Sequence, residues 1–131
     1  MLLYVMMNTP KHKFSNFRVG YKIWLNNEEG VGILGEGIIE LLRQIEKTGS
    51  LVAASNIQEV SYRKAWGDIK NAEALLGVQL IDRKRGGECG GTSTLTLDAK
   101  RIIEAWDKLH SKFDQSIEDM IIEFKKFIKS K

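Results

Sequence analysis

The sequence predicts a mainly α fold with a small β-wing (α+β), in the form of a winged helix-turn-helix followed by a long C-terminal helix. Apolar residues recur at helical spacing in the segments 35–47 and 61–76, and a short segment with a serine cap and small residues lies between them. A glycine-rich basic stretch then separates two short runs of β-forming residues. The last segment, 98–131, keeps the helical pattern almost to its end. Three helices followed by a hairpin is the order of elements in a winged helix-turn-helix.

Size and composition limit the kind of protein that the chain can be. Its 131 residues accommodate one compact domain and one extended element. The net charge of +3 fits a polyanionic partner, but so small an excess does not identify one. Because Cys89 is the single cysteine, we expect no disulfide, no thiol zinc site and a cytoplasmic location. No run approaches the roughly 20 apolar residues of a membrane span, so we expect no membrane partner.

The start of the chain divides into an arm and a domain. Residues 1–17 have no usable period and contain the only proline, so we interpret them as a poorly ordered N-terminal arm. Residues 18–97 are the predicted winged helix-turn-helix domain, which begins with a strand at 19–25. A turn is expected at the glycines that follow, which are Gly30, Gly32 and Gly35.

Two helices are predicted next. The first spans about 35–47, because its apolar residues share one stripe, formed by Ile38, Leu41, Leu42 and Ile45. Gly49 is its expected C-cap. Ser50 is expected to cap a second, short helix that reaches about residue 57. That helix carries small residues suited to a close helix crossing, namely Ala53, Ala54 and Ser55.

A third helix and a hairpin complete the domain. Ser61 is expected to cap the helix at 61–76, and Gly77 to end it. Its buried face is predicted to consist of Ala65, Ile69, Ala72 and Leu76. Strands at 78–82 and 94–97 then flank the basic, glycine-rich tip of the hairpin.

The region 98–131 is predicted to be one long helix that pairs two copies of the chain. A seven-residue register places its core-forming residues on two adjacent lines. One line holds Ala99, Trp106, Phe113, Met120 and Phe127, and the other holds Ile103, His110, Ile117 and Phe124. All of them except Ala99 are candidate homodimer contacts. The alternative is a helix that folds back on its own domain.

Several segments carry the motifs of a known family. They are Lys22-Ile-Trp-Leu25, Gly35-Glu-Gly-Ile-Ile-Glu-Leu-Leu, Gly49-Ser50, Ser61-Tyr-Arg-Lys-Ala-Trp66, Leu80-Ile-Asp-Arg83, the glycines 86, 87, 90 and 91, and Leu95-Thr-Leu. Together they resemble the N-terminal domain of the molybdate-responsive transcriptional regulators, the ModE family. The run Leu76-Gly-Val-Gln-Leu-Ile also resembles the related LysR-type helix-turn-helix. The resemblance covers about residues 20–110.

This resemblance implies the DNA-binding and dimer-forming half of such a regulator. Family members sense molybdate in C-terminal β-rich domains, whereas this chain ends with its long helix, so we expect no molybdate site and no cofactor in it. Two residues of the turn between the second and third helices depart from the family pattern. Glu59 stands where glycine or a similar residue is usual, and Gln58 where a small or apolar residue is usual.

The predicted function is sequence-specific DNA binding by a homodimer, with the helix 61–76 in the major groove. The candidate groove residues are Ser61, Tyr62, Arg63, Lys64, Trp66 and Lys70. Arg63 is the expected guanine contact, while Trp66 is undecided between the groove and the interior. The wing, about 83–93, is expected on the backbone or minor groove through Arg83, Lys84, Arg85, Gly86, Gly87, Gly90 and Gly91. Ser50 is expected to cap its helix and is a further candidate phosphate contact.

Two other function classes stay open at this point. One is a dimeric protein-interaction adaptor with a vestigial helix-turn-helix. The other is a nucleotide-binding enzyme fragment, because Gly30-x-Gly-x-x-Gly35 follows a strand and precedes a helix. That motif requires an apolar strand after the helix, whereas 48–58 has the pattern of a capped helix. No catalytic set of residues is evident, so we expect neither an enzyme nor a metal site.

Overall fold

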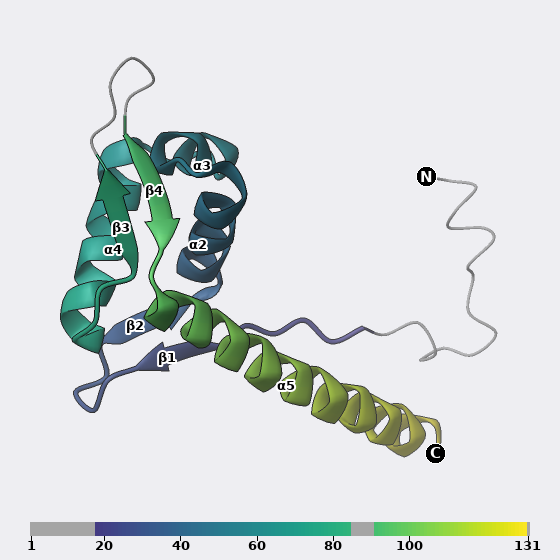
Figure 1. Cartoon of the computed structure of the whole chain (residues 1–131). Helices are drawn as coiled ribbons and strands as arrows, with labels where there is room; N and C mark the ends of the chain where they lie inside the picture. The colour runs from purple at the N-terminus through teal and green to yellow at the C-terminus, as the bar shows by residue number, and fades with distance from the viewer. Residues whose placement is uncertain (1–17, 85–90, 131) are drawn as a thin grey trace, which may run out of the picture. The chain divides into compact units, whose positions relative to one another are not determined.

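The computed structural model describes residues 18–84 and 91–130, with the elements β1, β2, α2, α3, α4, β3, β4 and α5 in chain order (Figure 1). These residues belong to two compact units. One unit is Lys22–Asp107, and the other joins the described residues up to Tyr21 to those from Lys108 onward. The predicted order of three helices, a hairpin and a long helix is confirmed. The predicted N-terminal arm, 1–17, lies outside the described residues.

A short hairpin precedes the helices. Strand β1, Trp24–Asn26, pairs antiparallel with β2, Gly32–Gly35. Two predictions were therefore wrong, because the first strand begins later than 19–25 and the segment 30–35 contains a second strand instead of only a turn. Leu34 anchors β2 in the core at 5% exposure. The glycines on either side of its apolar pair have no side chains, so they hid the alternation that identifies a strand.

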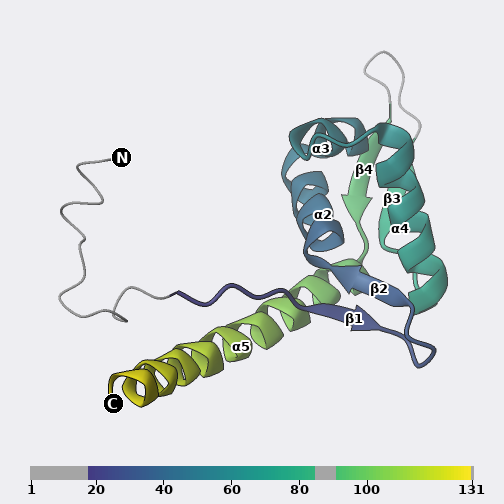
Figure 2. The same cartoon turned by 180° about the vertical axis from the view of Figure 1, so that it is seen from behind.

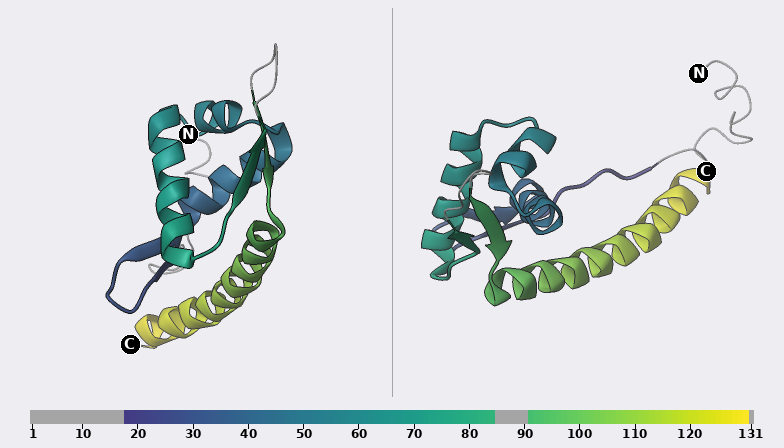
Figure 3. Two further views of the ribbon diagram at one scale, coloured as in Figure 1. Left: turned by 60° about the vertical axis from the view of Figure 1, so that its left-hand side comes forward. Right: turned by 45° about the horizontal axis from the view of Figure 1, so that its top comes forward.

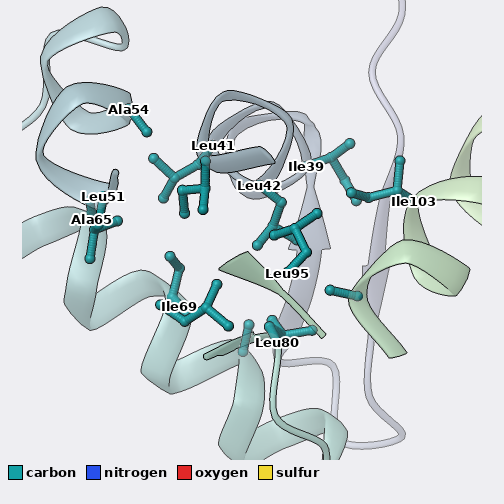
Figure 4. Packing of buried hydrophobic residues seen from close by; sticks show 14 of the residues in the cluster. Ile39, Leu41, Leu42, Leu51, Ala54, Ala65, Ile69, Leu80, Leu95 and Ile103 are labelled. Carbon is teal, nitrogen blue, oxygen red and sulfur yellow. The ribbon is translucent and has the colours of Figure 1, made fainter. Parts of the chain in front are cut away.

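Helix α2, Glu36–Thr48, presents one apolar stripe to the core. Its end agrees with the prediction, since Gly49 adopts φ 71° and donates its N–H to the carbonyl of Ile45 at 2.8 Å. One member of the predicted stripe changes, because Ile39 is buried and Ile38 only partly so. Figure 4 shows Ile39 beside Ile103 of α5, which extends the buried face of α2 on that side.

Helices α3, Leu51–Ile57, and α4, Tyr62–Leu76, form the helix-turn-helix. Ser50 and Ser61 cap them as predicted, and each hydroxyl accepts a backbone N–H of the first turn at 3.0 Å. The small residues Ala54 and Ser55 of α3 and Ala65 of α4 are buried, which suits a close approach of the two helices, whereas Ala53 is only half-buried. Of the predicted inward positions on α4, Ala65, Ile69 and Ala72 are buried and Leu76 is half-buried.

The turn between these helices accommodates its two unusual residues. Glu59 adopts φ 58°, the left-handed conformation in which glycine is favoured, at a cost of about 1 kcal/mol. Gln58 donates its side-chain N–H to the carbonyl of Gly37 at 3.2 Å, which ties the turn to the start of α2. The turn therefore keeps the conformation that a glycine would give it.

One hydrophobic core holds the unit Lys22–Asp107 together (Figure 4). All three helices of the domain, both wing strands and the start of α5 contribute to it. Each fully buried aliphatic side chain contributes roughly 1.5–3 kcal/mol to folding. The core therefore fixes the orientation of α4, and with it which side of α4 faces solvent.

A second hairpin corresponds to the predicted wing. Strand β3, Ile81–Lys84, pairs antiparallel with β4, Thr92–Leu95. The predicted strands were displaced by two or three residues, because the hydrogen-bonded ladder starts at the buried pair Ile81 and Leu95 and runs toward the wing tip, whereas the buried Leu80 lies outside it. The N–H of Ser93 donates to the carbonyl of Gly49 at 2.8 Å, which attaches β4 to the junction between α2 and α3.

The wing strands open toward the helix-turn-helix end of the domain. In two opposite views, the end of β3 and the start of β4 lie at the same end of the unit as α3 and the first turns of α4 (Figure 2). The views in Figure 3 agree. Helix α5 begins at the other end of β4.

Helix α5, Leu97–Lys129, begins inside the domain core. Ile103 and Trp106, two of the predicted dimer contacts, are 9% and 3% exposed within the chain itself. This part of the helix therefore follows the alternative in which it packs on its own domain. Arg43 of α2 donates to both carboxylate oxygens of Asp107, which raises the pKa of the arginine and fixes α5 to α2.

In the other unit, the segment that precedes β1 contacts the second part of α5. The hydroxyl of Tyr21 donates to Asp114, and the Tyr21 ring stacks on His110 with a centroid distance of 5.9 Å. The Nδ1 atom of His110 lies 3.2 Å from Asp114. The hydrogen bond from Tyr21 is the main cause that lowers the pKa of Asp114. None of the helices in the described part of the chain is both long enough and apolar enough to cross a membrane.

Candidate nucleic-acid interface

The first turn of α4 is an exposed, cationic surface. Tyr62, Arg63 and Lys64 are all exposed, and no acidic residue accompanies them in that turn. The N-terminus of a helix carries a partial positive charge, so cations there destabilise the helix by about 0.3–1 kcal/mol each. A surface that is electrostatically unfavourable for the free protein becomes favourable beside a polyanion.

Trp66 joins this surface to the wing. The Cζ atom of Arg83, on β3, lies 4.8 Å from a ring centroid of Trp66 and 5.6 Å from that of Tyr62. The Nζ atom of Lys70 lies 4.4 Å from a ring of the same indole. These distances are within the roughly 6 Å range of cation–π attraction. The structure therefore brings together four predicted site residues from two elements, Tyr62, Trp66, Lys70 and Arg83.

Trp66, which the sequence left undecided between the groove and the interior, takes part in both the core and the cationic surface. Its side chain is half-buried and packs against the core, and it also supports the two cations. The sequence carried no signal for the contact with Arg83, because those residues lie on different elements and only the fold sets their distance.

The other predicted site residues differ in how they are held. Lys64 pairs with Asp68 at 2.8 Å, and Lys70 pairs with Glu73 at 3.0 Å. Within the described ranges, Arg63 and Lys84 are exposed and form no ion pair. Four predicted wing residues, Arg85, Gly86, Gly87 and Gly90, lie outside the described residues, whereas Gly91 is described and exposed.

Glu73 is a positioning residue that the sequence analysis missed. Its Oε2 atom accepts the N–H of Leu80 at 2.7 Å and that of Ile81 at 3.4 Å, while Oε1 pairs with Lys70. Burial opposes its ionisation, but the backbone donors and Lys70 together outweigh burial and lower the pKa of Glu73. The carboxylate thus fixes the backbone leading into β3 against α4. A glutamate seven residues before a buried backbone N–H has no recognisable sequence signature.

Replacing Glu73 by glutamine is expected to lower the free energy of unfolding by about 1–2 kcal/mol at pH 7, because charged hydrogen bonds are lost. The folded-state pKa lies below the ordinary value of 4.5, so this contribution is present above pH 4.5 and is lost as the pH falls through the lowered pKa. Urea denaturation of both proteins at neutral and strongly acidic pH measures the difference.

The exposed Glu46 on α2 provides the matched control, since Glu46→Gln is expected to change stability little at either pH. A Glu73→Gln penalty that stays constant down to acidic pH would show that the charge does not hold the backbone of β3.

A second candidate surface is the apolar stripe on the later part of α5. Phe113, Met120, Phe124 and Phe127 are exposed, and Phe127 is 71% exposed. Ile117 is half-buried. It lines a shallow groove together with Arg18, Val19, Met120, Ile121 and Phe124. His110 is also half-buried, next to Tyr21. Six of the predicted dimer contacts therefore remain outside the core.

The described residues contain no group of three or more histidine, cysteine, aspartate or glutamate side chains that could hold a metal ion. The glycine motif Gly30-x-Gly-x-x-Gly35 forms the loop end and strand β2 of a two-stranded hairpin. The segment after α2 is helix α3, so the strand that a dinucleotide-binding unit requires is replaced by a helix.

Sequence comparison finds relatives among curated proteins, although no protein-family model matches. The chain is 37% identical over 71 residues to the transcriptional regulator ModE of Yersinia pestis, covering 54% of this chain and 27% of that protein. It is 34% identical over 71 residues to the DNA-binding transcriptional dual regulator ModE of Escherichia coli (strain K12), with the same coverage of both proteins. The molybdenum-pterin-binding protein MopB of Rhodobacter capsulatus is 31% identical over 91 residues, covering 64% of this chain and 34% of that protein.

The resemblance to ModE regulators is thereby confirmed, and the chain spans 27% to 34% of the length of these relatives. Among solved structures, the DNA-binding domain of CbnR in its complex with DNA matches 66% of this chain and 93% of its own. The TM-score is 0.52 and the sequence identity is 20%. At that identity the match concerns the fold, which is a winged helix-turn-helix.

Proposed function

We propose that this chain, whose sequence resembles ModE regulators, is a sequence-specific DNA-binding module of a transcriptional regulator. The observation that carries the proposal is the cationic and aromatic surface formed by the first turns of α4 and by Arg83 of the wing. The relatives described as transcriptional regulators, and the solved neighbour bound to DNA, support it.

In this proposal α4 lies in the major groove. A helix with its side chains is 10–12 Å wide and the groove is about 12 Å wide, so α4 fits with its first turns toward the bases. Arg63 is the proposed base-reading residue, because its exposed guanidinium matches the two acceptors on a guanine edge. Ser61 and Ser50 stand at helix N-termini, where backbone N–H groups can donate hydrogen bonds to phosphate oxygens.

The wing is proposed to follow the DNA backbone or the minor groove. Arg83 and Lys84, at the end of β3, supply positive charge on the same side of the domain as the start of α4. Such contacts release counterions from DNA, and affinity therefore falls as the salt concentration rises.

Salt dependence is the direct test of this function. The affinity of the full chain for a short duplex is expected to fall steeply with salt, and Lys84→Gln is expected to reduce the log–log slope by about one unit. Fluorescence anisotropy of a labelled duplex at several salt concentrations measures both slopes.

Lys100 provides the control, because it is exposed on α5, which begins at the end of β4 away from the wing tip. Lys100→Gln is expected to leave the slope unchanged. Binding that ignores salt, or no binding to duplex DNA, would favour the protein-interaction adaptor instead.

The chain is further proposed to act as a homodimer through the later part of α5. Two copies of an exposed apolar stripe with heptad spacing can cover each other as a coiled pair. The six contacts proposed are His110, Phe113, Ile117, Met120, Phe124 and Phe127. The proposed partners are therefore double-stranded DNA and a second copy of the chain, and no catalytic role is proposed. Because a bacterial transcriptional regulator must reach the chromosome, the proposed location is the cytoplasm.

A further inference from the structure

We propose that Trp66 is a positioning residue for DNA binding, which holds Arg83 of the wing against α4 before DNA arrives. The inference rests on the proposed function and concerns how its cationic surface is assembled. It assigns Trp66 a role through another side chain, in place of a contact with a base.

The geometry of Trp66 suits this role. The indole is fixed, because it is half-buried and packs against the core. Arg83 reaches it from β3, with its Cζ atom 4.8 Å from a ring of the indole and 5.6 Å from the ring of Tyr62. Two aromatic side chains, one helical turn apart on α4, therefore share one guanidinium.

Besides the burial of Ile81 in the core that it shares with α4, β3 is joined to α4 by side-chain contacts at both of its ends. Glu73 holds its beginning through the N–H groups of Leu80 and Ile81. The contact between Trp66 and Arg83 holds the strand near its exposed end. Without the second contact, the wing would still be tethered at its base, but Arg83 would be held to α4 only by its longer, 5.6 Å contact with Tyr62.

An aromatic partner can hold Arg83 in place and leave its charge available to DNA, which an acidic partner cannot do. A carboxylate would attract Arg83 but would also neutralise the charge that a phosphate requires. The face of an indole attracts the guanidinium through its quadrupole and leaves the net charge intact. Among the described residues, Arg83 forms no ion pair, so its positive charge is available to DNA.

The expected consequence is a gain in affinity from preorganisation. Ordering a long cationic side chain costs free energy when it happens during binding. Because Trp66 already orders Arg83, Trp66→Leu is expected to weaken duplex binding by about 5- to 10-fold. Trp66→Phe, which keeps a weaker aromatic face, is expected to give a loss between wild type and Trp66→Leu.

A double-mutant cycle tests the coupling. The full chain is compared as wild type, Trp66→Leu, Arg83→Gln and the double variant, with affinities measured on one random-sequence duplex. The expected result is that Trp66→Leu has an effect of about twofold or less once Arg83 is already glutamine. Additive losses would mean that Trp66 acts on DNA independently of Arg83, which overturns the proposal.

A readout without DNA accompanies the cycle. In ¹⁵N-labelled protein, Arg83→Gln is expected to shift the indole N–H resonance of Trp66, assigned by its loss in Trp66→Phe. If Trp66→Leu does not fold, Trp66→Phe replaces it in the cycle, and an unchanged indole resonance overturns the proposal. A wild-type chain that binds no duplex overturns the proposed function as well, whereas additive losses in a chain that binds DNA overturn this inference alone.

Discussion

Replacing Arg63 by alanine is expected to reduce discrimination between a selected operator and random DNA by about 1–3 kcal/mol, or roughly 5- to 150-fold. The operator is first obtained by selecting bound fragments from random duplex DNA. Competition binding at fixed salt then measures the ratio of the two affinities for the wild type and for Arg63→Ala.

The same substitution is expected to raise thermal stability slightly instead of lowering it. Arg63 is exposed, forms no ion pair among the described residues, and places a positive charge at the N-terminus of α4. Removing an unfavourable charge of this kind stabilises a helix by about 0.3–1 kcal/mol. If Arg63→Ala raises the free energy of unfolding while it lowers discrimination between operator and random DNA, Arg63 serves binding and not stability.

Arg101 on α5 offers a matched control, since it is another exposed arginine on a helix of the same domain. Arg101→Ala is expected to leave discrimination unchanged. If Arg63→Ala weakens binding equally on operator and random DNA, Arg63 contacts phosphate and another residue must read the sequence.

The second large effect is expected from Phe113→Glu, which should raise the dimer dissociation constant by about two orders of magnitude or more. A carboxylate placed in an apolar helix pair, without a partner, costs several kcal/mol. Sedimentation velocity over a range of protein concentrations measures the monomer fraction. Operator binding is expected to weaken with it, because the two half-sites are then bound independently.

Ile122 provides the control for this experiment. It is 51% exposed on the same helix, but it lies off the heptad lines that contain Phe113. Ile122→Glu introduces the same charge in place of a similar apolar side chain and is expected to leave the dimer intact. Equal dissociation by both variants, or by neither, would rule out the proposed helix pair.

The sequence was sufficient to predict elements whose signals are local. The caps Ser50 and Ser61 and the left-handed glycines Gly49 and Gly77 stand where the sequence placed them. The long helix α5 was evident from its period. Cap chemistry and helical spacing act over a few neighbouring residues, so a single sequence contains them in full.

Strand β2 and the stripe of α2 show where local signals were insufficient. Residues 32–35 read as a glycine turn, yet they form a strand because β1 pairs with them and Leu34 enters the core. Ile39 displaced Ile38 from the buried stripe because the start of α5 covers that side of α2. Both outcomes depend on a partner element, β1 in the first case and α5 in the second, and the periodicity of a segment does not indicate which element it packs against.

The candidate site divides in the same way. The sequence by itself determined that Tyr62, Arg63 and Lys64 begin a capped helix and that basic residues follow between two strands. Only the tertiary structure decided that Arg83 rests on Trp66, that Glu73 holds the backbone before β3, and that Trp106 belongs to the core. The reason is physical: cation–π contacts, buried hydrogen bonds and core packing depend on distances between residues far apart in the chain, and those distances exist only once the chain has folded.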